Sequence, residues 1–169
     1  MFTSTKGFTL IELLLYMAIA VIVLGSLSIL LLNLYDARVK TQSITEVDQQ
    51  AAQVIERIRL VARNAQAITT PTPTNSSASL VLDVVTGAND PTTFDLSSNT
   101  LRIQEGVATP IALTNNIVIT SGLSFTNLSA PNDTEAIRVS FTLSRINPEN
   151  RSAFTYTRTY TTTIALRTN

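Results

Sequence analysis

A long apolar segment lies near the start of the chain, and the sequence after it has apolar residues at regular spacings. From Leu10 to Leu32 the residues are almost all apolar, and a helix of this length covers about 35 Å, enough to cross the roughly 30 Å hydrocarbon core of a membrane. Gly25, Ser26 and Ser28 weaken the helix locally. An unpaired charge in hydrocarbon costs about 2.5 to 3.5 kcal/mol. The pattern therefore predicts a membrane-spanning helix whose one carboxylate, Glu12, needs a partner of opposite charge.

Beyond this segment, apolar residues recur at spacings of three and four. They are Ile44, Val47, Ala51, Val54, Ile58, Val61, Ala65 and Ile68. Such a helix buries one narrow face, either in a coiled-coil dimer or against a β-sheet of its own chain. The sheet is favoured because the strands described next otherwise lack a covering layer. Residues 33–68 are thus predicted to continue the helix of residues 8–32, and residues 69–79, which contain Pro71 and Pro73, to form a loop.

Residues 80–169 are predicted to form a β-rich globular domain. Alternating or β-branched runs lie at residues 80–85, 94–96, 101–104, 117–119, 123–126, 136–146 and 154–166. Ser121-Gly122 separates two of these runs, and residues 97–100 and 147–150 are the expected hairpin turns. Strands joined by short turns pair antiparallel. The predicted fold class is therefore α+β, with one long helix packed on an antiparallel sheet.

The start of the apolar segment carries a motif, Lys6-Gly7-Phe8-Thr9-Leu10-Ile11-Glu12. It resembles the N-terminus of type IV prepilins and pseudopilins, in which a short leader ending in Lys-Gly precedes Phe-Thr-Leu-Ile-Glu and an apolar stretch. The resemblance implies that a prepilin peptidase cuts between Gly7 and Phe8 and removes the leader of residues 1–7, to which Lys6 contributes a positive charge. It further implies N-methylation of Phe8 and a role in assembly for Glu12.

Cleavage after Gly7 would create a positive amine on Phe8. In one helix this amine and the Glu12 carboxylate lie about one turn apart. In a stack of parallel helices, the amine of one subunit would meet the carboxylate of the next subunit. Cleavage thus offers Glu12 the partner that its apolar surroundings require.

The C-terminal part carries a second resemblance. Gly122-Leu123-Ser124-Phe125, an alternating strand and a threonine-rich strand ending in Leu166-Arg167 look like J-type or W-type minor pilins. The chain also has no cysteine, whereas many major type IV pilins close a C-terminal loop with a disulfide. The resemblance therefore implies a pilin-like fold and a minor pilin or pseudopilin.

The implied function is that of a structural subunit in a fibre for adhesion or motility, type II secretion or DNA uptake. Its implied partners are the prepilin peptidase and methyltransferase, other pilin subunits through Phe8 to Leu32, and an inner-membrane assembly platform. Before assembly the chain would cross the cytoplasmic membrane once, with its C-terminal domain outside the cytoplasm; afterwards it would lie in an extracellular or periplasmic fibre. The alternatives are a signal-anchored extracytoplasmic binding module, in which Glu12 is incidental, and a hydrolase acting through Asp/Glu pairs.

Composition supports a role without catalysis. The chain has 12 Lys plus Arg, 12 Asp plus Glu and no histidine, so no net field recruits nucleic acid and no Ser-His-Asp or Cys-His arrangement can form. No enzyme activity and no cofactor are expected. Acidic residues and arginines share the amphipathic helix, and we expect them to form a solvated, salt-bridged face. These residues are Glu46, Asp48, Glu56, Arg57, Arg59 and Arg63.

Two groups of acidic and amide residues could supply oxygen ligands for calcium. They are Asn89, Asp90 and Asp95, and Asn132, Asp133 and Glu135. Neither group has the spacing of an EF-hand loop. Asp and Asn are common in turns because their side chains bond to the local backbone, so a structural role is expected and no metal site is predicted.

Overall fold

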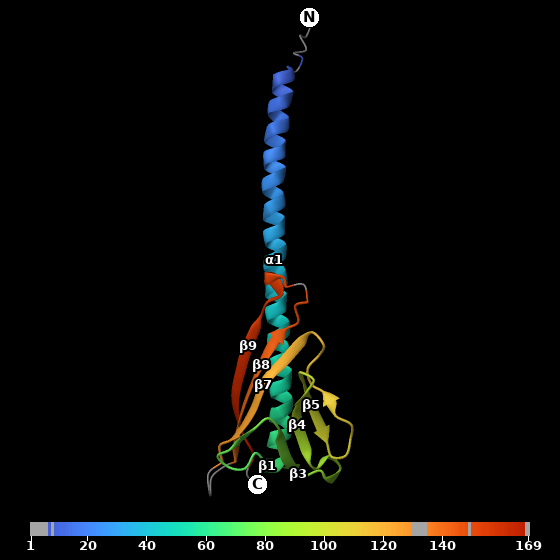
Figure 1. The fold of residues 1–169 in the computed structure, drawn as a ribbon, viewed down its shortest axis with the longest axis vertical. Helices are drawn as coiled ribbons and strands as arrows, with labels where there is room; N and C mark the ends of the chain where they lie inside the picture. The colour runs from blue at the N-terminus through green and yellow to red at the C-terminus, as the bar shows by residue number, and fades with distance from the viewer. Residues whose placement is uncertain (1–6, 8, 130–134, 149, 168–169) are drawn as a thin grey trace, which may run out of the picture. The chain divides into compact units, whose positions relative to one another are not determined.

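The computed structural model describes residues 7, 9–129, 135–148 and 150–167 (Figure 1). The chain divides into two compact units, Met1–Val39 and Lys40–Asn169. One helix, α1 (Leu10–Arg63), contributes to both units. Each unit is described by itself below.

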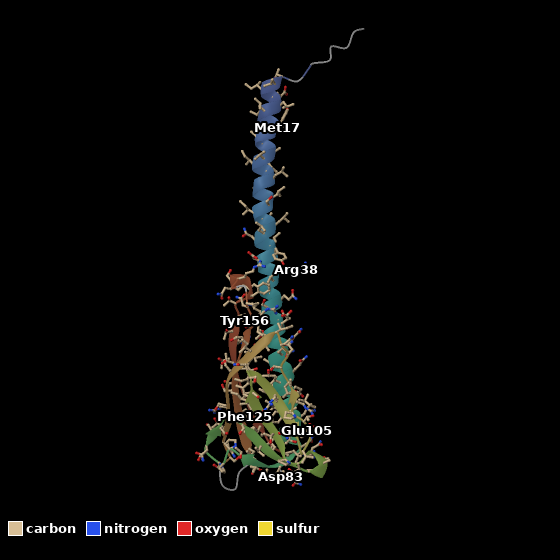
Figure 2. The ribbon with its side chains drawn as sticks, turned by 45° about the vertical axis from the view of Figure 1, so that its right-hand side comes forward. Met17, Arg38, Asp83, Glu105, Phe125 and Tyr156 are labelled. Carbon is tan, nitrogen blue, oxygen red and sulfur yellow. The ribbon has the colours of Figure 1, made fainter. Side chains whose placement is uncertain are left out.

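In the first unit, α1 exposes apolar side chains on every side. Figure 2 shows side chains projecting all round the helix near Met17. An 18-residue window of α1 has a mean hydropathy of 2.6, so this helix is long and apolar enough to cross a membrane. The Ser26 hydroxyl donates to the Val23 carbonyl and the Ser28 hydroxyl to the Leu24 carbonyl, both at 2.8 Å. Each hydroxyl thus has a hydrogen-bond acceptor in its own helix. The helix continues through Gly25.

In the second unit, one face of α1 packs on β-sheets of the same chain. The buried residues of this face are Ser43, Val47, Ala51, Val54, Ile58 and Ala62. The predicted apolar face is confirmed from Val47 to Ile58, but Ala62 is buried where Val61 was expected. The predicted spacing averages 3.5 residues, whereas an α-helix has 3.6 residues per turn, so the buried line moves by one residue over this length.

The strands form two antiparallel sheets instead of the one predicted. The five-stranded sheet has the order β1 (Ala65–Thr70), β3 (Leu80–Val84), β4 (Thr92–Ser97), β5 (Thr100–Glu105) and β6 (Ile111–Ala112). The four-stranded sheet has the order β2 (Ser76–Ser77), β7 (Val118–Asn127), β8 (Ala136–Arg145) and β9 (Thr157–Ala165). Phe94 of the first sheet and Phe125 and Phe141 of the second are fully buried in one core with α1. The α+β class, a long helix on antiparallel strands, is confirmed.

The predicted continuation of the helix to Ile68 is wrong. The helix ends at Arg63, and β1 pairs with β3 from Ala65↔Val84 to Thr70↔Val81. Two register irregularities in β1 place its buried residues, Ala65 and Ile68, three positions apart. This spacing imitates a helix, although the residues form a strand. The predicted loop of residues 69–79 likewise contains the end of β1 and the short strand β2.

The predicted break at Ser121-Gly122 is a bulge inside one strand. β7 pairs with β8 on both sides of this point, with a register shift between Ser121 and Ser124. Gly122 has a φ of 60°, a value that glycine adopts without steric cost. The turn of the β4–β5 hairpin is confirmed, with Ser98 and Asn99 at φ 49° and 61°, as in type I′ turns.

The connection between β8 and β9 is longer than the predicted turn of residues 147–150. Asn147 organises it by donating from Nδ2 to the Arg151 carbonyl at 2.8 Å and accepting at Oδ1 from the Arg151 N–H at 3.1 Å. A short 3-10 helix, η2 (Ser152–Phe154), follows, and β9 begins at Thr157 rather than at the predicted Phe154. Glu149 lies outside the described residues.

We expect Gly106→Ala to destabilise the second unit by about 3 kcal/mol. Gly106 has a φ of 55°, and a Cβ atom there would lie 2.4 Å from the Ala88 carbonyl oxygen, so the substitution adds a clash to the left-handed backbone penalty of about 1–2 kcal/mol. Gly122→Ala is the matched control, since its Cβ would lie 3.8 Å from Thr142 Oγ1 and only the backbone penalty applies. Urea unfolding measures both variants. Equal losses would contradict the predicted clash.

Candidate functional site

The helix start is held by Thr9 and Glu12. Thr9 precedes α1, and its Oγ1 accepts the Glu12 N–H at 3.3 Å while its carbonyl accepts the same N–H at 3.1 Å. Thr9 is thus the N-cap, and Glu12 occupies the third helical position, where acidic residues favour the helix dipole. Thr-x-x-Glu is also the capping-box pattern, so the sequence itself carries a signal for this helix start.

Glu12 is partly exposed and has one hydrogen bond to its side chain within α1. Its Oε1 accepts a hydrogen bond from the Tyr16 hydroxyl at 3.4 Å, one turn further along α1. A hydrogen bond of this length is weak, so most of the carboxylate's bonding capacity is available to another group. Gly7 is exposed, and no heavy atom of another described residue lies within 4 Å of the position of a Cβ. Lys6 and Phe8 lie outside the described residues.

The helical segment that follows Glu12 offers a continuous apolar surface. Its exposed large residues run from Leu13 to Leu34 and include Tyr16 and Met17. Soluble proteins rarely expose apolar areas of this size, and such areas mark contacts with membranes or other proteins. The segment is therefore a surface for contact with lipid or with another protein, and Glu12 lies at its N-terminal end.

The ion pairs of the second unit differ from the predicted ones, in which charged residues of the helix pair with one another. Arg59 pairs with Glu56 at 3.0 Å within α1, as predicted. Arg57 instead pairs with Glu105 of β5 at 2.5 Å. Glu46 pairs with Arg145 of β8. Glu46 and Arg57 are therefore turned to the strands, whereas Glu56 keeps a partner on its own helix.

Asp48 is shared by two residues of β9. The Arg158 guanidinium lies 3.3 Å from Asp48 Oδ1, and the Tyr160 hydroxyl donates to the same oxygen. Burial, followed by this hydrogen bond, raises the pKa of Tyr160 above its ordinary value. The hydroxyl therefore keeps its proton, and its hydrogen bond to Asp48, to a higher pH than an ordinary tyrosine would. These contacts fasten β9 to α1 within the second unit.

An open cleft of about 890 Å³ lies where α1 ends and β1 begins. Its lining includes two carboxylates, Glu105 and Glu135. Glu105 pairs with Arg57, and Glu135 Oε2 accepts the Ile68 N–H at 2.8 Å. Both carboxylates thus have structural partners, and neither is placed as the free acid or base that hydrolysis by an Asp/Glu pair requires.

The carboxylates among the candidate calcium ligands have structural partners where they are described. Asp90 Oδ1 accepts the Val84 N–H at 3.2 Å, and Asp95 forms two bonds to Arg102, at 3.0 and 2.5 Å. That hydrogen bond raises the pKa of Arg102. Asn132 and Asp133 lie outside the described residues. Within the part of the chain that the structure describes, no three His, Cys, Asp or Glu residues are grouped to hold a metal ion.

Comparison with known proteins identifies the N-terminal segment. Residues 3–28 match a family model described as the prokaryotic N-terminal methylation motif. No curated protein and no solved structure matches the chain. The matched range includes Gly7, Phe8, Glu12 and the first part of the apolar surface. The match supports a type IV pilin-like or pseudopilin precursor, which is a structural subunit, and implies processing by a prepilin peptidase and assembly with other pilins.

Proposed function

We propose that this chain, whose residues 3–28 carry the methylation motif, is a minor pilin or pseudopilin that assembles into a type IV pilus-like fibre. The observation that carries the proposal is the combination of that motif with an exposed apolar helix containing one carboxylate near its start. The fibre would serve adhesion or motility, type II secretion or DNA uptake. The resemblance of residues 122–167 to J-type or W-type subunits supports the minor role.

Each part of the N-terminus has a role in this proposal. A prepilin peptidase cuts between Gly7 and Phe8, and the exposure of Gly7 supports access to that bond. Phe8 is then methylated on its new amine, and Lys6 leaves with the leader. The Phe8 amine of one subunit pairs with Glu12 of the next subunit, while residues 8–32 pack against equivalent helices.

The remaining domains and partners follow from the same proposal. The chain crosses the cytoplasmic membrane once through residues 8–32, meets an inner-membrane assembly platform and holds its globular domain outside the cytoplasm. After assembly that domain decorates an extracellular or periplasmic fibre. Glu46, Asp48 and Glu105 of that domain form ion pairs within the fold, which supports a structural role for these carboxylates.

The processing step is tested by intact mass spectrometry of protein extracted from membranes of a host that contains a prepilin peptidase. We expect the loss of Met1 to Gly7 and the gain of one methyl group on Phe8. A parallel extract from a host without the peptidase is the control and should retain the leader. A protein that keeps Lys6 in the first host would contradict the proposal and favour the signal-anchored binding module.

A further inference from the structure

The two sheets end in edge strands of very different regularity. β2 and β6 have 2 residues each, and β1 has 6 residues with two register irregularities. Short or bulged edges are a common protection against pairing with another chain. β9 has 9 residues and pairs with β8 without a register shift from Ser144↔Thr157 to Ala136↔Ala165. It is the long, regular edge of the four-stranded sheet.

The outer backbone groups of β9 can be assigned from its pairing. The Arg145 N–H donates to the Tyr156 carbonyl at 2.9 Å, and the Leu166 N–H donates to the Glu135 carbonyl at 2.8 Å. In an antiparallel pair, residues alternate between those bonded to the neighbouring strand and those directed away from it. Thr157, Thr159, Thr161 and Thr163 therefore direct their N–H and C=O groups outward. Among the described residues, no backbone hydrogen bond reaches these outward groups.

The side chains of β9 carry one charge, that of Arg158, which is paired with Asp48 of α1. On one face, threonine hydroxyls pair with hydroxyls of β8, as in Thr142–Thr159 at 2.7 Å and Ser140–Thr161 at 3.2 Å. On the other face, Arg158 and Tyr160 are held by Asp48. Residues 157–165 contain no proline and no lysine, the residues that commonly protect an edge strand. Threonine itself favours extended backbone.

We propose that β9 is a strand-addition site that receives an extended, proline-free segment of a neighbouring fibre subunit. The ligand chemistry is that of a peptide backbone, whose N–H and C=O groups complement the outward groups of β9. The identification of the partner as a fibre subunit rests on the proposed function, whereas the edge itself does not.

The direction of β9 argues against a second β9 as the partner. The start of β9 contacts Asp48, and Leu166, which follows β9, lines the cleft at the end of α1 with Arg63. β9 therefore runs in the same direction as residues 40–63 of the helix, beside which it lies (Figure 1). A two-fold pairing of β9 strands is antiparallel and would point these two helices in opposite directions. Subunits of one fibre share an orientation, so the neighbour must present another segment.

The edge can be tested with a free peptide, which can pair antiparallel with β9 because no helix fixes its direction. The probe is a fluorescent peptide with the sequence of residues 157–165 and a lysine tail, added to the full chain in detergent micelles. Antiparallel pairing centred on Thr161 places Thr159 opposite Thr163, a favourable cross-strand pair. We expect saturable binding, measured as a rise in fluorescence anisotropy.

Two substitutions of one residue separate the backbone edge from the hydroxyl face. Thr161→Pro removes an outward N–H and leaves the bonds to β8, so we expect at least about tenfold weaker binding with little change in the thermal melt. Thr161→Val keeps the N–H and removes the hydroxyl, and its binding should stay within about twofold of wild type. Binding that is equal in all three proteins would overturn the proposal.

Modified peptides give the same test without altering the protein. N-methylation at the positions of Thr159 and Thr163 blocks the peptide edge that faces β9 and should abolish binding. N-methylation at the positions of Arg158 and Thr162 blocks the opposite edge and should be tolerated. Absence of saturable binding by the unmodified peptide, or equal binding of both methylated peptides, would overturn the site.

Two further outcomes identify the partner. The chain has no cysteine, so a Thr161→Cys variant that forms a disulfide-linked dimer in membranes would assign the edge to the β9 of a second copy and overturn the proposed partner segment. Peptide binding in micelles does not depend on processing. Normal binding by a chain that is never processed would therefore contradict the fibre partner, whereas lost binding with normal processing would contradict the strand-addition site.

Discussion

Glu12→Gln should lower incorporation into fibres by more than about tenfold. In the proposed fibre, the Glu12 carboxylate faces the Phe8 amine of a neighbouring subunit in apolar surroundings. Removing one partner of a buried ion pair costs about 3–5 kcal/mol, because the remaining charge stays buried without its counter-ion. Each factor of ten corresponds to about 1.4 kcal/mol, so the defect should be well above the error of a fibre assay.

Glu12→Gln removes the charge of the side chain and leaves the local structure of the helix start unchanged. Glutamine has nearly the size of glutamate and is accepted at the third helical position of a capping box, so the contacts of Thr9 with the helix start should persist. A neutral side chain also enters the membrane more readily than a charged one. Processing and membrane insertion should therefore be normal, which intact mass and membrane fractionation will show.

Tyr16→Phe is the matched control for Glu12→Gln. It removes the hydroxyl that donates to Glu12 within the same helix and leaves the carboxylate charged. We expect this variant to enter fibres like wild type, measured as the amount in the sheared fraction. Normal incorporation of Glu12→Gln would exclude the assembly contact and favour an anchored module, and a defect in Tyr16→Phe would indicate that the carboxylate acts through its own helix.

Arg145→Ala should destabilise the second unit by about 3 kcal/mol. The Arg145 side chain is 15 % exposed and its partner, Glu46, is 27 % exposed, so the ion pair is largely shielded from water. Its loss leaves Glu46 without its cation at the interface between α1 and β8. The substitution also removes the guanidinium that lies 5.4 Å from the centre of the Phe154 ring, a contact worth about 0.5–1 kcal/mol.

A second ion pair provides the comparison for Arg145. Arg102 and Asp95 form a well-aligned pair on neighbouring strands, but their side chains are 31 % and 38 % exposed, so Arg102→Ala should destabilise the second unit much less than Arg145→Ala does. Urea unfolding of a fragment beginning at Asn33, which retains the buried core of the second unit, measures both. A double-mutant cycle with Glu46→Ala should show coupling for Arg145. Equal losses for Arg145→Ala and Arg102→Ala would contradict the assigned role of burial.

Local patterns were sufficient for much of the second unit. The apolar spacing from Val47 to Ile58 predicted the buried helical face, and the alternation from Ile137 to Leu143 predicted the buried side of β8. Both patterns arise from the geometry of a single helix or strand. The β4–β5 hairpin was predictable for a related reason, since its strands and turn are adjacent in the sequence.

Partner selection could not be predicted from these patterns. Glu46 and Arg145 are far apart in the sequence, and a charge pattern on the helix alone suggested partners on the same helix. At the N-terminus, the motif predicted the roles of Gly7, Phe8 and Glu12, which remain predictions, while the contact from Tyr16 to Glu12 appeared only in the structure. Long side chains choose among several neighbours, and that choice depends on the faces that packing brings together.

By itself, the sequence determined the apolar helix, the methylation motif and the succession of helix and strands, because each is encoded by residues close together in the chain. Only the tertiary structure decided that α1 ends at Arg63, that the strands divide into two sheets and that β9 is the long regular edge. Residues 65–68 fit a helix or an irregular strand equally well by spacing. Their pairing with β3 selects the strand, because backbone hydrogen bonds between distant segments outweigh a weak local preference.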